Sequence, residues 1–103
     1  MSGYFLVREA RGPAWDPARA RREQDGWEEH AAFVDRLVDE GVIVLAGPLG
    51  DVDGEYAALV AHVDDEQEIR RRLADDPWTD TVLRIDSVER WTLWVGSPSS
   101  SRP

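Results

Sequence analysis

Hydrophobic residues recur at helical spacing in the segment between Gly26 and Gly41. Its apolar residues are Trp27, Ala31, Phe33, Val34, Leu37 and Val38. At about 100° per residue they fill one arc, and the acidic and basic residues of the segment fall outside it. Asp25, with Glu28 three residues on, is typical of a helix N-cap, and Gly41 is typical of a residue just past a helix end. The pattern therefore predicts the main helix of the chain between Asp25 as its N-cap and Gly41 just past its end.

Shorter apolar runs predict four strands and a second helix. The strands are expected over Tyr4 to Arg8, Val42 to Ala46, Glu55 to Val63, and Val82 to about Val95, the last bent or interrupted near Ser87. Leu49 to Gly54 is expected to connect the second and third strands as a hairpin. Asp64 with Gln67 predicts the start of a short helix that runs through Ala74, because Pro77 prevents its continuation. The segment after Pro17 is expected to be partly helical.

The predicted order is β-α-β-β-α-β, which is typical of an α+β ferredoxin-like fold. In that fold an antiparallel four-stranded sheet carries two helices on one face. The runs Val42 to Ala46 and Tyr56 to Val63 are apolar on both faces, however, and two helices can cover only one. Because the second face needs a cover, we expect a homodimer in which the same face of another copy supplies it.

Length and composition limit the architecture and the partners. A chain of 103 residues has room for one domain, which we place at residues 1–95. Residues 96–103 form a Gly/Ser/Pro tail with nothing to bury, and we expect this tail to be disordered. The net charge of -9 argues against nucleic acid and anionic membrane surfaces as partners.

Missing residue types exclude several kinds of chemistry. All 12 basic residues are Arg and there is no Cys, so a Schiff-base lysine, a thiol nucleophile and a thiolate metal site are excluded. Neither of the two histidines has a second histidine at helical spacing, and we expect no metal and no other cofactor. With no signal peptide recognisable and no run of about 18 apolar residues, a cytoplasmic location is expected.

His30 requires an explanation because it lies near the centre of the apolar arc of the main helix. A buried imidazole must find a hydrogen-bond partner or stay neutral, and a backbone carbonyl or a buried water would be a purely structural solution. A carboxylate on one ring nitrogen would instead fix the tautomer and free the other nitrogen for proton exchange. Asp76 is the candidate carboxylate, although Asp before Pro is by itself a common loop dipeptide. We expect the two side chains within about 2.6 to 3.2 Å, or bridged by one water, beside a cleft lined by Phe33 and Trp78.

Several short motifs follow one another in a fixed order along the chain. They are Glu29-His30-Ala31-Ala32-Phe33, Gly41, Gly47-Pro48-Leu49, Gly54 and Asp76-Pro77-Trp78. From Tyr4 to about Trp91 this order resembles the YciI-like, or YCII-related, family of small bacterial proteins. The resemblance implies a dimeric α+β barrel with an active site made of a histidine of the first helix and the aspartate before the proline, here His30 and Asp76. We expect Gly47 and Pro48 to contact the substrate together with the two aromatic residues of the cleft.

The resemblance also points to a class of reaction. One characterised branch of the family is a dehydrochlorinase acting on chlorinated hydroxyquinol, and the wider fold includes muconolactone isomerases and cofactor-free monooxygenases. This chain differs from many members in carrying Trp78 where they have Phe or Tyr, and in its Arg-rich segment between Arg8 and Gln24.

Two functions follow as hypotheses. In the first, the protein is a lyase or isomerase in which His30 moves a proton on a small cyclic or carbonyl-bearing ligand, while Asp76 orients and charges the imidazole. In the second, it is a non-catalytic dimeric module that binds a ligand or a protein partner, and the two residues form a structural hydrogen bond.

Overall fold

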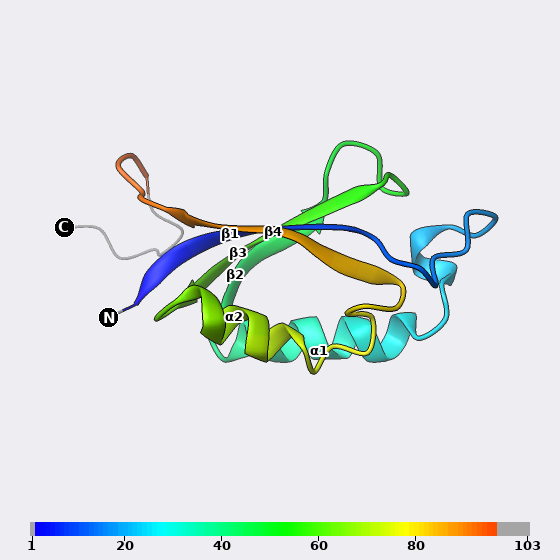
Figure 1. Ribbon diagram of the computed structural model, residues 1–103, viewed down its shortest axis with the longest axis horizontal. Coiled ribbons are helices and arrows are strands. Elements are labelled where there is room, and N and C mark those ends of the chain that lie inside the picture. The colour runs from blue at the N-terminus through cyan, green and yellow to red at the C-terminus, as the bar shows by residue number, and fades with distance from the viewer. Residues whose placement is uncertain (1, 97–103) are drawn as a thin grey trace.

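Four strands form one antiparallel sheet, and two helices cover one of its faces (Figure 1). The computed structural model describes residues 2–96, so nearly all of the expected tail, 97–103, lies outside the described residues. Along the chain the elements are β1 (Gly3–Arg11), the 3-10 turn η1 (Arg21–Glu23), α1 (Trp27–Asp39), β2 (Ile43–Pro48), β3 (Tyr56–Val63), α2 (Glu66–Leu73) and β4 (Leu83–Trp91). The strand order β2-β3-β1-β4, with the order βαββαβ along the chain, confirms the ferredoxin-like α+β fold.

The hydrophobic core lies between the sheet and the two helices. Alternate residues of the strands face it, and the core cluster consists of Phe5, Val7, Phe33, Leu37, Val42, Ile43, Leu59, Ala61, Val63, Ile69 and Leu73. The antiparallel register pairs Phe5 with Ala61 and Val7 with Leu59, so these side chains share one face of the sheet. This packing holds α1 and α2 against the sheet, and the burial of Phe33 and Leu37 sets which face of α1 is turned toward the sheet.

The sheet also shows where the expected strand limits were wrong. β1 continues to Arg11 because it pairs with β3 as far as Ala10 and with β4 as far as Arg11. β4 ends at Trp91, which pairs with Tyr4 near the start of β1, so no partner strand remains for Trp94 and Val95, which are exposed. The irregularity expected near Ser87 is present as a shift in the register between β1 and β4.

Both helices begin one residue later than the sequence pattern suggested. Gly26, not Asp25, is the N-cap of α1, and the side chain of Asp25 instead accepts a hydrogen bond from Arg19. In α2 the N-cap is Asp65, not Asp64, and its carboxylate accepts the backbone N–H of Glu68 at 2.8 Å. After Pro17 the expected helical segment is a single 3-10 turn, η1.

Candidate active site

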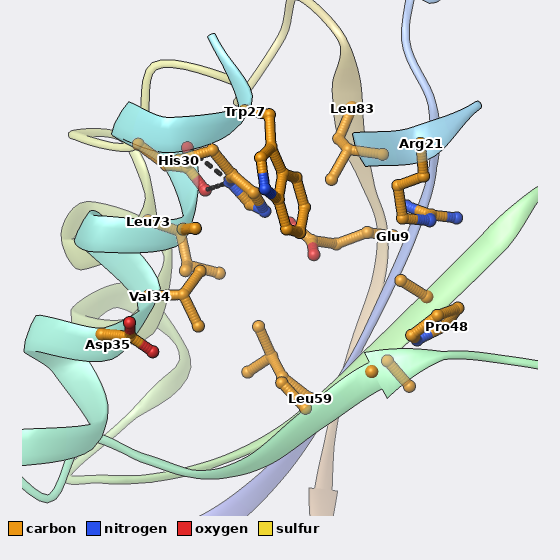
Figure 2. Close-up of a pocket in the computed structure, with 16 residues that line it drawn as sticks. Glu9, Arg21, Trp27, His30, Val34, Asp35, Pro48, Leu59, Leu73 and Leu83 are labelled. Carbon is orange, nitrogen blue, oxygen red and sulfur yellow. Dashed lines mark hydrogen bonds and ion pairs between the residues drawn. The ribbon is translucent and has the colours of Figure 1, made fainter. Parts of the chain in front are cut away.

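A cavity of about 400 Å³ opens between α1 and the sheet (Figure 2). Its walls are mainly apolar and come from α1, β2, β3 and the two core residues Leu73 and Leu83. The complete lining is Glu9, Arg21, Trp27, His30, Ala31, Val34, Asp35, Ala46, Gly47, Pro48, Ala57, Ala58, Leu59, Leu73, Asp76 and Leu83. Titratable side chains line the cavity on two sides: His30, Asp35 and Asp76 come from α1 and the loop after α2, and Glu9 and Arg21 come from β1 and η1. The rest of the lining suits an apolar ligand body.

His30 and Asp76 make direct contact in this cavity. The imidazole Nδ1 lies 2.9 Å from Oδ1 and 2.8 Å from Oδ2 of the carboxylate, within the distance expected from the sequence. Since an ionised carboxylate only accepts hydrogen bonds, Nδ1 carries the proton and donates it. In the neutral ring Nε2 is then the acceptor, and Figure 2 shows the ring directed into the cavity. The arrangement leaves one ring nitrogen available to a ligand.

The local backbone holds Asp76 in place. Residues 77 and 78 turn the chain after α2, so that the backbone N–H of Trp78 donates to Asp76 Oδ1 at 2.9 Å. The Thr79 N–H donates to the Asp76 carbonyl at 3.0 Å, and the Asp76 N–H donates to the carbonyl of Leu73 at the end of α2. The backbone of this turn therefore fixes the carboxylate independently of its contact with the histidine. Only 5% of Asp76 is exposed.

Trp78 fixes the orientation of the imidazole by stacking on its face. Its ring stacks on His30 with centroids 4.1 Å apart and planes 8° apart, and its indole N–H donates to the carbonyl of Asp25 at 2.7 Å. Trp27 packs against both rings at tilted angles. The imidazole is thus held by a stack and a carboxylate together, which limits its rotation.

The other residues expected at the site divide into two groups. Gly47 and Pro48, at the end of β2, line the cavity. Trp78 lies behind His30 and is 1% exposed, and Phe33 belongs to the core cluster and is 4% exposed. Neither aromatic residue is part of the cavity lining.

Glu9 is a cavity residue that the sequence pattern did not reveal. It is 7% exposed, and burial raises the pKa of its carboxyl to about 7, with the nearby Asp76 charge raising it further and His30 and Arg21 lowering it. The signal was present in the alternation of β1: Phe5, Val7 and Glu9 share the core face, so a glutamate there faces the interior. The expected strand ended at Arg8, one residue too early for this inference.

Arg21 is the second residue that the sequence pattern did not reveal. It is 6% exposed, its Nε donates to the Val52 carbonyl at 3.0 Å, and its Nη2 donates to the Gly54 carbonyl at 2.9 Å. Burial lowers the pKa of this guanidinium, Glu9 raises it, and the group remains a cation. The bonds show what one arginine of the Arg-rich segment does: it ties η1 to the β2–β3 hairpin. No spacing rule in the sequence predicts that pairing.

Residues 2–96 contain neither a metal-binding cluster nor a membrane-spanning helix. In that part of the chain, no three or more His, Cys, Asp or Glu side chains are placed so as to hold a metal ion. None of its helices has the length and apolar character needed to cross a membrane.

Comparison with known proteins gave a family match. The model of the family described as "YCII-related domain" matches residues 10–92, a range that includes Arg21, His30, Gly47, Pro48 and Asp76. No match was found among curated proteins or among solved structures.

Proposed function

The chain belongs to the YCII-related domain family, and from this premise we propose that it is a lyase or isomerase that acts on a small molecule without a cofactor. The observation that carries the proposal is the pairing of His30 Nδ1 with Asp76 at 2.8 Å beside an apolar cavity. A histidine whose tautomer is fixed by a buried carboxylate, and whose second nitrogen faces a cavity, is equipped for general acid-base catalysis.

The chemistry follows from the protonation states. The neutral Nε2 takes a proton from the ligand, and the imidazolium that forms is stabilised by the Asp76 carboxylate on the opposite nitrogen. Since Asp76 is buried and His30 is stacked on Trp78, the ring needs little reorganisation during the transfer. General acid-base catalysis of this kind contributes about 10² to 10⁴ in rate.

The shape and lining of the cavity support a small ligand. About 400 Å³ accommodates a single ring with short substituents, and apolar residues from α1, β2 and β3 would surround its body. A cyclic molecule that bears a carbonyl or hydroxyl group fits this lining, because its polar atoms can meet His30 while its ring carbons contact Val34 and Leu59. A dehydrochlorinase-like elimination from a chlorinated, hydroxylated ring is one reaction in this class.

Solvent deuterium exchange tests the proposal with simple compounds in place of the natural substrate. The protein is incubated in D₂O with cyclohexanone, γ-butyrolactone or chlorohydroquinone, and NMR follows loss of the carbon-bound protons while an electrode follows chloride release. We expect faster exchange or release than in buffer, and a decrease of about 10² to 10⁴ in His30→Gln. Asp76→Asn should lose much of the rate as well.

Glu28→Gln is the matched control, because it removes one carboxylate from an exposed position on the same helix. It should keep the full rate. Absence of any acceleration by the wild-type protein, or equal rates in wild type and His30→Gln, would contradict the proposal and favour the non-catalytic binding module.

A further inference from the structure

Within the part of the chain that the structure describes, the carboxyl of Glu9 has no hydrogen-bond or ion-pair partner. It stands on β1 with its side chain directed into the cavity that holds His30 (Figure 2). Among residues 2–96 no hydrogen bond or ion pair to this carboxyl is present, although the residue is only 7% exposed. The residue is buried, but its oxygens are not among the fully enclosed unpartnered atoms, so they are accessible from the cavity that Glu9 lines. A ligand in the cavity can complete their hydrogen bonding.

We propose that Glu9 is a second proton-transfer residue, a general acid that protonates an oxygen of the ligand while His30 takes a proton from the neighbouring carbon. This inference rests on the proposed function and names its substrate class: an uncharged cyclic ketone, lactone or related carbonyl compound. Glu9 comes from the sheet and His30 from α1, so the two groups approach a bound ligand from different elements.

The step balances without any co-reactant. Nε2 of His30 takes a proton from the carbon next to the carbonyl, and the electrons of that C–H bond form a C=C bond. The π electrons of the carbonyl group move to its oxygen, which takes the proton of Glu9, so the ligand becomes a neutral enol. The reverse transfer restores both groups. In a ligand with a further C=C bond conjugated to the enol, a proton returned to the far end of the conjugated system gives an isomer.

The charges around the cavity suit this exchange. With Glu9 protonated and His30 neutral, Asp76 and Arg21 balance each other, and the exposed Asp35 on the α1 side of the lining adds one negative charge. The step only moves one proton from Glu9 to His30. The sum of charges over these groups is the same before and after it. An anionic ligand would disturb the balance, and Arg21 is a poor site for it because its Nε and Nη2 already donate to Val52 and Gly54.

Burial outweighs the charged groups that face Glu9 and favours its protonated form. Burial is the main cause that raises its pKa to about 7, Asp76 adds to it, and His30 and Arg21 oppose it. On the neighbouring strands Glu9 pairs with Ala57 and Ile85, neither of which carries a charge. At neutral pH a large share of Glu9 therefore retains the proton that the step requires.

The first experiment needs no variant. The protein is labelled with ¹³C at glutamate carboxyls, Glu9 is assigned through its backbone, and its carboxyl shift is followed from pH 3 to pH 9. We expect the carboxyl shift of Glu9 to have its titration midpoint near pH 7. The carboxyl shift of the exposed Glu28 serves as an internal comparison. A midpoint for Glu9 at the ordinary value of a glutamate would overturn the proposal.

The second experiment compares binding and exchange in Glu9→Gln. NMR titration with cyclohexanone measures affinity at pH 5.5 and pH 8.5, with cyclohexanecarboxylate as the charged analogue. Wild type should bind the ketone about tenfold more weakly at pH 8.5, whereas Glu9→Gln should hold its affinity because the amide donates at both values. The carboxylate should bind weakly at either pH.

Deuterium exchange into cyclohexanone then separates the two proposals. We expect Glu9→Gln to bind the ketone and yet to exchange its protons at least about tenfold more slowly, because an amide cannot transfer the proton. An unchanged exchange rate in Glu9→Gln, with His30→Gln inactive, overturns the role of Glu9 and leaves the proposed function intact. Absence of exchange in wild type overturns both.

Discussion

Burying Glu9 costs folding free energy whenever its carboxyl is ionised. Its pKa rises from 4.5 to about 7 in the folded protein, chiefly through burial. The folded state thus binds this proton more tightly than the unfolded chain does. The contribution of this bound proton to the free energy of unfolding is fully present below about pH 4.5 and is lost as the pH rises through about 7. The difference is about 3 kcal/mol by linkage.

Glu9→Gln should remove this pH dependence. We expect wild type to lose up to about 3 kcal/mol more stability than Glu9→Gln between pH 4.5 and pH 8.5, because the amide has no charge to bury. Urea unfolding at fixed protein concentration measures it at both pH values. Parallel losses in the two proteins would show that Glu9 is not the group responsible, and Glu28→Gln should behave as wild type.

Single residues could be inferred from the sequence only where a pattern made them exceptional. His30 stands out because it interrupts an apolar helix face, and Asp76 follows as the carboxylate of a defined turn. Glu9 needed the correct end of β1, since the strand alternation places it inside only if the strand reaches it. Arg21 depends on a contact with the β2–β3 hairpin 31 to 33 residues away, which no local pattern contains.

At the level of elements, the first turn of α1 positions His30 in the candidate site. Gly26 has φ of 80°, in the left-handed region, and its carbonyl accepts the N–H of His30 at 2.9 Å. A Cβ on Gly26 would lie 3.3 Å from the indole nitrogen of Trp78, whose ring stacks on His30. A change in the first turn of α1 should therefore also move the rings of Trp78 and His30.

Gly26→Ala should destabilise the protein by about 1–3 kcal/mol, because alanine is strained at this φ and its methyl group crowds Trp78. Gly41→Ala is the matched control: its φ is 79°, but nothing lies within 4 Å of an added Cβ. We expect Gly41→Ala to cost stability with no change in exchange activity, and Gly26→Ala to cost more and to lower that activity. Thermal unfolding and the deuterium-exchange assay measure both. Equal effects on activity would refute the coupling.

The elements themselves could be predicted because their hydrophobic periods are long and regular, whereas their ends depend on competition between neighbours. Asp25 and Asp64 have the side chain that an N-cap needs. In α1, however, the N-cap is Gly26, which adopts a left-handed conformation. In α2 it is Asp65, whose side chain bonds to the N–H of Glu68. β4 ended early because β1 offers no further partners, which is a property of the sheet and not of the β4 sequence.

On the scale of the whole molecule, the face of the sheet opposite the helices carries exposed apolar side chains together with Arg8, His62 and Glu89. In Figure 1 both helices lie below the sheet, and none of the described residues places a helix above it. The register puts Leu45 beside Val60, and Leu6 beside the same valine, on that open face. Leu45 is 59% exposed, and Trp91, near the other edge, is 46% exposed. We propose that a second copy covers this face, as the two-sided hydrophobicity of β2 and β3 indicates.

Placing a charge on this face should separate the two copies. Leu45→Arg introduces a cation on the β2 strand of an interface that should bury on the order of 1,500 Å² in total, so we expect a shift from dimer to monomer at micromolar concentration. Val52→Arg is the matched control, since Val52 is 54% exposed but lies in the β2–β3 hairpin, off the sheet. Sedimentation velocity distinguishes the species. A wild-type monomer would contradict the proposed dimer, and a Leu45→Arg dimer as stable as wild type would place the interface elsewhere on the molecule.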